Sequence, residues 1–181
     1  MQPALPISDS DRLLADILSP GLSVLFCGLN PGMRAVKVGH HFDGQNNRFW
    51  QTLYLSGFTP KQLRPDEDRS LLSYGCGLTT LVERATPGAT DIAIKEFSDS
   101  SHLLEEKIQE FSPKWVAFLG KDGFAAISRQ RHPHWGEQQE TFAGAKVWLL
   151  PNPSGRNRAF TLGSLVASYR ELRAASISSG A

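Results

Sequence analysis

The sequence predicts an α/β fold in which helices cover both faces of a short, mainly parallel sheet. Four short runs of apolar residues show no polar alternation, which is typical of strands buried in a parallel sheet. Segments with helical periodicity lie between these runs, and such alternation along a chain produces a three-layer α/β/α sandwich. The length of 181 residues is that of a single domain with a full core.

The first half of the chain begins with a helical pattern over residues 11–18, which precedes the apolar run SVLFC at 23–27. We predict that this run is the first strand, because it is short, apolar and non-alternating. Helical patterns at 48–55 and 69–74 follow. They lead to a second apolar run at 78–82, which we predict to be the second strand.

The second half of the chain repeats this alternation. A helical pattern at 101–111 precedes the run WVAFL at 115–119, the third expected strand, and a helical pattern at 121–130 follows it. The fourth expected strand spans 147–150. The last helix should begin after Thr161, whose hydroxyl suits an N-cap. The apolar positions on its buried face are Leu162, Leu165, Val166, Tyr169 and Leu172.

The two ends of the chain are rich in Pro or Ser and have no periodicity. We therefore expect flexible termini over residues 1–10 and 175–181, and one domain over 11–174 without repeats or linkers. No apolar run reaches the roughly 20 residues of a membrane span, and no secretory signal pattern is present. We expect a monomeric, cytoplasmic protein.

The Cys and His residues do not form a metal-binding pattern. Cys27 and Cys76 lie in apolar contexts without a CxxC pair, so we expect buried, reduced thiols. The five His residues lack acidic or Cys partners at helical spacing. No metal and no cofactor is expected.

Positive charge is concentrated in two segments of a chain whose net charge is only +1. Residues 25–64 carry five Lys or Arg against one acid, and residues 151–181 carry four against one. Residues 65–110 are acidic. Each basic segment alone could be a solvated face, but two beside similar loops favour a polyanionic ligand.

Two expected strands end in similar polar turns, SVLFCGLNPG at 23–32 and KVWLLPNPSG at 146–155. In a parallel sheet, ligands bind beyond the carboxyl ends of the strands. The first turn lacks the Lys-Ser/Thr of a phosphate loop, and no GxGxxG opens a helix. Taken alone, Asn30 could merely form an Asx-turn.

Three motifs together carry a resemblance to a known family: GLNPG, GHHFDGQNNRFW at 39–50 and NPSGRNR at 152–158. They resemble the mismatch-specific uracil and thymine DNA glycosylases of the uracil-DNA glycosylase superfamily, closest to the bacterial G:U mismatch-specific enzymes. The likeness runs from about residue 11 to 172 and includes CGLTTLVERATPG and VAFLGK. GHHF and VERATPG look more like the eukaryotic thymine enzymes, whereas NPSG looks like the bacterial ones.

The resemblance implies a monofunctional DNA glycosylase. It would flip uracil, with ethenocytosine and thymine as further candidates, out of a G:U-type mismatch in double-stranded DNA and hydrolyse the N-glycosidic bond, leaving an abasic site for base excision repair. In this family the Asn of GxNPG holds the attacking water, and here that residue is Asn30. An amide oxygen can orient water but cannot take a full proton. The resemblance assigns base contacts to Leu29, Gly32, Phe42 and Thr80, with the Phe42 ring stacked on the base; its alternative role is core packing.

The second turn matches the family's loop that enters the minor groove and fills the space left by the flipped base. Its residues here are Asn152, Pro153, Ser154, Gly155, Arg156 and Arg158. The resemblance places the wedge at Arg156, where bacterial relatives have an apolar side chain. An arginine can stack in the gap and bond to the opposite guanine.

The sequence departs from the bacterial pattern near the predicted pocket. Thr80 stands where a bacterial relative has lysine, and Ala35 replaces a small hydroxyl residue. Asp91 could be a second polar group over the pocket, even a base. Its simpler role is a helix N-cap before IAIKEF, which we favour.

Two rival functions stay open at this point. A non-catalytic binder of mismatched or damaged DNA would keep the basic loops but has no use for Asn30. An enzyme acting on free nucleosides would not need a wedge with two arginines.

Overall fold

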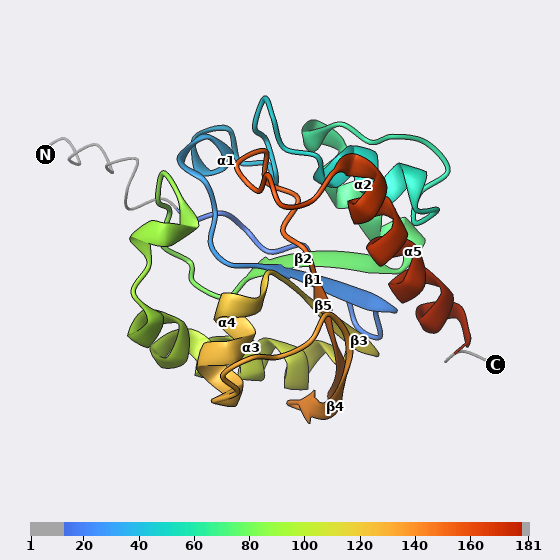
Figure 1. Ribbon diagram of the computed structural model, residues 1–181. Coiled ribbons are helices and arrows are strands. Elements are labelled where there is room, and N and C mark those ends of the chain that lie inside the picture. The colour runs from blue at the N-terminus through green and yellow to red at the C-terminus, as the bar shows by residue number, and fades with distance from the viewer. Residues whose placement is uncertain (1–12, 179–181) are drawn as a thin grey trace, which may run out of the picture.

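The computed structural model describes residues 13–178, in which five strands form one sheet of order β2-β1-β3-β5-β4 (Figure 1). The strands are β1 (Val24–Gly28), β2 (Cys76–Thr80), β3 (Trp115–Leu119), β4 (Gly136–Phe142) and β5 (Ala145–Leu150). Neighbouring strands are parallel except for β4, which is antiparallel to β5 at one edge. The mainly parallel sheet expected from the apolar runs is therefore confirmed.

Helices cover both faces of the sheet (Figure 1). One face packs against α2 (Phe49–Leu55), the 3-10 helix η2 (Pro65–Tyr74) and α5 (Leu162–Ser178), and the other against α3 (Ile94–Phe111) and α4 (Lys121–Ser128). Strand β1 is buried along its whole length because its side chains enter the hydrophobic cores on both faces of the sheet. Val24 and Phe26 belong to the first, and Leu25 and Cys27 to the second. This is the predicted three-layer α/β/α sandwich.

Helix α5 begins as expected. The Thr161 hydroxyl accepts a hydrogen bond from the Ser164 N–H at 3.2 Å, which is N-cap geometry. The predicted core positions are buried, except that Leu162 is only half-buried. The helix continues to Ser178, so residues 175–178 are not the loose end that we expected. Residues 1–10 and 179–181, the other parts of the expected flexible termini, lie outside the described residues.

The predicted helix over residues 11–18 is wrong for residues 13–18, which form no helix. Ile17 instead forms an antiparallel bridge to Leu78 of β2, with N–H···O distances of 2.8 and 2.9 Å. A Cβ on Gly77 would lie 2.5 Å from the Ile17 carbonyl oxygen. The glycine in β2 therefore permits a close backbone approach that the helical pattern did not anticipate.

Two further elements have no counterpart in the sequence prediction. β4 is an exposed, polar edge strand, joined to β5 by a tight turn in which Ala143 and Gly144 have φ values of 50° and 91°. Helix α1 (Met33–Val38) has only six residues and follows GLNPG directly. Neither carries an apolar periodicity long enough to be recognised.

Both cysteines are free and buried, as predicted. Burial raises the pKa of the Cys27 thiol, and it raises that of Cys76 to about 12, so neither is a reactive thiolate. Within residues 13–178, no group of three or more His, Cys, Asp or Glu side chains is placed to hold a metal. No helix of this part of the chain is long and apolar enough to cross a membrane.

Candidate active site

The loops after β1 and β2 lie side by side at the carboxyl end of the sheet. Backbone hydrogen bonds continue from the strands into the loops, from Leu81 N to Gly28 O and from Val82 N to Leu29 O, both at 2.9 Å. Further along, Gly32 and Thr86 form a parallel bridge. The GLNPG and VERATPG motifs are thereby brought together, as expected for loops that follow adjacent parallel strands.

Asn30 lies between these two loops and is half-buried. Its Nδ2 donates to Thr86 Oγ1 at 2.7 Å, to Arg84 O at 3.1 Å and to Pro31 O at 3.2 Å. A simple Asx-turn would leave the side chain to bond with its own turn. Here the amide bonds to residues more than fifty positions away in the chain.

Thr86 fixes which way the Asn30 amide faces. The Thr86 hydroxyl donates its hydrogen to Gly88 O at 2.7 Å, so it can only accept from the amide nitrogen. The two backbone carbonyls next to Nδ2 require the same orientation. No described residue donates to Asn30 Oδ1, so this oxygen can accept a hydrogen bond from a water.

Phe42 is held in an uncommon backbone conformation, with φ at 55°. The buried Asp68 carboxylate accepts from the His41 N–H at 3.1 Å, and the Trp50 indole donates to His41 O at 3.2 Å. The His41 ring is fixed as well, because its Nε2 must be protonated to donate to Ala15 O at 2.8 Å. Several contacts thus stabilise the strained turn that presents the Phe42 ring.

The Phe42 ring packs against Phe49, with ring centroids 3.9 Å apart and planes 22° from parallel. Its Cζ and the Cγ2 of Thr80 lie 3.9 and 3.7 Å from where a Cβ on Gly28 would be. Two of the predicted base-contacting residues, Phe42 and Thr80, therefore meet at the end of β1. Phe42 contacts the core, as its alternative role requires, while its half-exposed ring leaves base stacking a prediction.

The other two predicted base contacts are placed differently. The Leu29 side chain is 8% exposed and packs in the core beside Gly120 and Gly123, so a base contact would have to use its main chain. Gly32 is exposed, and a Cβ there would meet nothing within 4 Å. Its open surroundings leave its backbone accessible.

Asp91 does not cap helix α3, because α3 begins at Ile94 with Ala93 in the N-cap position. The N-cap interpretation was wrong. The Asp91 carboxylate instead accepts the Gly88 N–H at 3.0 Å and closes a short turn. A direct catalytic role for Asp91 stays a prediction.

The loop after β5, residues 152–161, is named here the groove loop. Asn152 begins it with an Asx-turn, in which its Oδ1 accepts from Ser154 N at 2.9 Å. Asn157 Nδ2 donates back to Asn152 O, also at 2.9 Å. Pro153 is buried and Ser154 half-buried, whereas Gly155, Arg156 and Arg158 are exposed. The residues expected to enter DNA therefore lie at the outer part of an internally bonded loop.

The groove loop touches the GHHFDGQNNRFW segment and the VERATPG loop, which lies beside GLNPG. A Cβ on Gly155 would lie 2.5 Å from Asn46 O, in the GHHFDGQNNRFW segment. The Arg156 Nη1 lies 2.6 Å from where a Cβ on Gly88 would be, in the VERATPG loop. The three motifs that the sequence singled out thus surround one site.

Ion pairs neutralise much of the positive charge that the sequence places in residues 25–64. Three of the five basic residues in 25–64 form ion pairs: Arg34 with Asp43, Lys61 with Glu67 and Arg64 with Asp66. No carboxylate in residues 13–178 lies within ion-pair distance of Arg156 or Arg158. Arg156 and Arg158 are therefore among the cations that stay free to attract phosphates.

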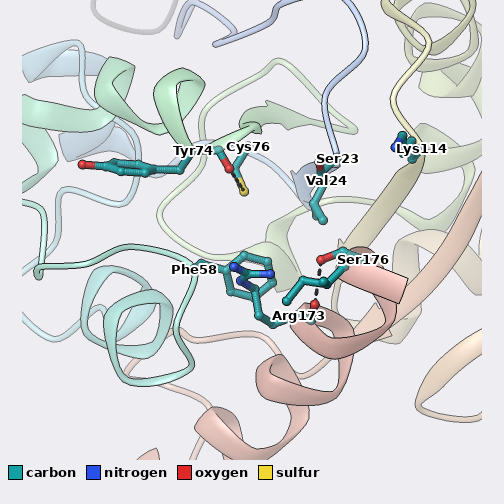
Figure 2. A pocket seen from close by; sticks show the side chains of 9 residues that line it. Ser23, Val24, Phe58, Tyr74, Cys76, Lys114, Arg173 and Ser176 are labelled. Atoms are coloured by element: carbon teal, nitrogen blue, oxygen red, sulfur yellow. Dashed lines mark hydrogen bonds between the residues drawn. The ribbon is translucent and has the colours of Figure 1, made fainter. Parts of the chain in front are cut away.

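A cavity of about 280 Å³ lies at the opposite end of the sheet (Figure 2). Ser23 and Val24 line it at the start of β1, Cys76 at the start of β2, and Arg173 and Ser176 on α5. The motifs GLNPG, GHHFDGQNNRFW and NPSGRNR contribute no residue to its lining. We place the active site at the carboxyl ends of the strands, where the motif loops meet.

Sequence analysis missed three residues that organise this site. Thr86 orients Asn30, Asp68 holds the turn before Phe42, and Arg48 binds the groove loop. Asp68 and Arg48 act across long sequence separations, so local pattern gave no signal for these contacts, although Arg48 lies inside the GHHFDGQNNRFW motif. Thr86 lies inside a quoted motif and could have been flagged as a buried hydroxyl beside an apolar strand.

Comparisons with known proteins identify the family and the fold of the chain. The family model of the uracil DNA glycosylase superfamily matches residues 15–173. The chain is also similar to the solution NMR structure of a proposed uracil DNA glycosylase from Methanosarcina acetivorans, at 18% sequence identity and a TM-score of 0.60. That likeness covers 90% of this chain and 98% of the other, and at this identity it supports the fold.

Proposed function

The chain belongs to the uracil DNA glycosylase superfamily, and from this premise we propose that it removes uracil from G:U-type mismatches in double-stranded DNA. The superfamily indicates a DNA glycosylase, a hydrolase of N-glycosidic bonds that acts in DNA repair. The preference for a mismatch and for duplex DNA is the proposed part.

The observation that carries the proposal is the fixed orientation of Asn30. Three acceptors hold its amide nitrogen, which leaves Oδ1 to bind the water that attacks the sugar. Because an amide is a weak base, bond breaking must run ahead of water attack, through an oxocarbenium-like sugar. Hydrogen bonds to the departing uracil anion would stabilise that transition state.

The base would lie against the Phe42 ring, near Thr80 at the end of β2. Thr80 is neutral and buried, so the pocket lacks a cation at this position. Since the uracil ring carries negative charge only as it leaves, backbone N–H groups of exposed loops such as that of Gly32 are suitable donors.

The groove loop supports action on duplex DNA. Extruding a base costs a few kcal/mol, least at a mismatch, and a side chain inserted into the stack offsets part of this cost. Arg156 is exposed on the outer part of the groove loop and has no ion-pair partner among the described residues. Its guanidinium can stack in the gap and donate to acceptor atoms of the opposite guanine, whose Watson–Crick edge is left unpaired by the flipped base.

A single-turnover assay on labelled duplexes tests the proposal. The panel should contain uracil opposite guanine, uracil opposite adenine and uracil in single-stranded DNA, with thymine and ethenocytosine opposite guanine. Heating in alkali then cuts each abasic site. We expect fastest cleavage of G:U duplex. Equal rates for single-stranded and mismatched uracil would contradict the specificity, and binding without cleavage would favour the non-catalytic alternative.

A further inference from the structure

One arginine outside the groove loop makes the contacts that define the loop's shape. Arg48 precedes α2 and extends its side chain to the groove loop. Its Nη1 donates to Phe160 O at 2.6 Å. Its Nη2 donates to Ser154 O and Asn157 O, both at 2.9 Å, and its Nε to Pro153 O at 3.3 Å. One guanidinium therefore binds four carbonyls of a single loop.

These four carbonyls converge on the half-buried cation without a carboxylate in the set. Carbonyl oxygens that face one another repel, so the loop would not hold this arrangement without a central donor. A guanidinium presents five N–H donors in a rigid plane, whereas the ammonium of lysine has three on a flexible stem. The geometry therefore requires arginine in particular.

Arg48 also connects the groove loop with the base-binding side of the site. Its own backbone N–H donates to Pro153 O at 3.1 Å. The next residue, Phe49, stacks on Phe42, and Asn46 lies against Gly155. Residues 42–49 thus contain both Phe42, whose ring is expected to contact the base, and Arg48, which anchors the groove loop.

We propose that Arg48 is a positioning residue that holds the groove loop in its DNA-inserting shape and keeps it in register with Phe42. This inference rests on the proposed function, because it assigns the loop a role in base extrusion. The Arg48 guanidinium bonds to loop carbonyls, so we assign it no direct role on the water or the base. It acts through the backbone of residues 153–160.

The test compares Arg48→Ala and Arg48→Lys with Arg170→Ala. Arg170 is a suitable control because it is an exposed arginine that donates to one backbone carbonyl, Leu55 O, away from both loops. The first readout is hydrogen exchange of residues 153–160 in the free protein. The second is the single-turnover rate on G:U duplex, with and without added guanidinium ion. Arg48→Lys keeps the charge and serves if Arg48→Ala does not fold.

We expect faster exchange of residues 153–160 in both Arg48 variants and no change in Arg170→Ala. The excision rate should fall by about 10- to 100-fold, as for other misplaced reacting groups, and guanidinium ion should restore part of it in Arg48→Ala alone. Unchanged exchange would overturn the proposal, and so would faster exchange with an unchanged rate. If the natural chain does not cleave G:U duplex, the proposed function fails, while the exchange result still decides whether Arg48 holds the loop.

Discussion

Gly155→Ala tests the contact that joins the groove loop to the segment bearing Phe42. The glycine is exposed on its outer side, so its sequence context alone gives no reason why alanine should be harmful. In the structure, the added Cβ would lie 2.5 Å from Asn46 O, 2.6 Å from Asn46 Cβ and 3.2 Å from Asn46 C. Two of the three atoms are backbone, so the clash cannot be relieved by a rotamer change.

The size of the effect follows from these distances. Real Cβ contacts below 3.0 Å are essentially absent, so one of the two backbones must move by about 0.5 Å or more. Inserting a methyl group into a packed contact of this kind costs about 1–3 kcal/mol. For a domain of this length, each kcal/mol lowers Tm by about 2–4 °C.

The measurement is urea unfolding of the variant beside the natural chain, combined with titration of a G:abasic duplex. If the segments stay in contact, the free energy of unfolding should fall. If the groove loop moves away instead, stability is retained and product binding weakens. We expect a lower free energy of unfolding, weaker product binding, or both.

Two other glycines serve as controls for the same chemical change. Gly163→Ala adds a methyl group in α5, where the nearest atom is 3.8 Å away, and should be neutral or slightly stabilising. Gly88→Ala meets only the mobile tip of Arg156 closely, so stability should barely change. Because Gly88→Ala displaces Arg156, the proposed wedge, it is a control for stability alone. The reasoning is refuted if Gly155→Ala matches both controls in stability and matches Gly163→Ala in product binding.

Three further results are expected. Thr86→Val should slow single-turnover excision by about 10- to 100-fold, because the Asn30 amide loses its orienting hydroxyl acceptor. Thr86→Ser keeps the hydroxyl and should stay near the natural rate. Equal excision rates for Thr86→Val and the natural chain would show that Thr86 has no role in the site. Burial lowers the pKa of His41 in the folded chain, so as pH falls the unfolded chain takes up this proton before the folded one does. The free energy of unfolding should therefore decrease as pH drops below about 6.5, by at most about 1.4 kcal/mol per pH unit. His41→Gln should flatten that part of a denaturant-unfolding profile, and parallel profiles would contradict this. Arg156→Ala should weaken binding to G:abasic duplex by about 1–3 kcal/mol and leave intact G:C duplex nearly unchanged; equal losses on both would make Arg156 a phosphate contact only.

The sequence predicted the central sheet because its strands are buried on both faces and therefore apolar without interruption. The same rule could not find β4, whose exposed residues carry no such signal. It also misassigned residues 13–18, where a backbone bridge to β2 outweighs the local helical pattern. Tertiary contact decided both cases.

In the candidate site too, the sequence indicated residues within motifs but not the contacts between distant segments. The resemblance indicated Asn30, in the loop directly after β1, and Phe42, in the segment after α1, and the structure brings the two segments together at the end of β1. It could not indicate that Leu29 packs in the core or that Asp91 closes a turn, because these depend on contacts across loops. Arg48 was counted only as one positive charge, yet its four bonds run to residues more than a hundred positions away.

A carboxylate in place of the Asn30 amide provides a further test. A carboxylate can act as a base, which by itself would favour an active Asn30→Asp variant. In the fold, the oxygen replacing Nδ2 would face Pro31 O and Arg84 O at about the present 3.2 and 3.1 Å. That repulsion should raise the pKa of the new carboxyl group. We therefore expect Asn30→Asp to be slower than the natural chain at neutral pH and to gain rate as pH falls.

The central claim is that Asn30 holds the attacking water and does not hold the DNA. The most direct measurement is the single-turnover excision rate of Asn30→Ala on G:U duplex, with the dissociation constant for the same duplex measured in parallel. We predict a rate lower by about 100-fold or more, as for other losses of a positioned reacting group, with a dissociation constant within a few fold of the natural chain. A natural excision rate in Asn30→Ala would contradict the account.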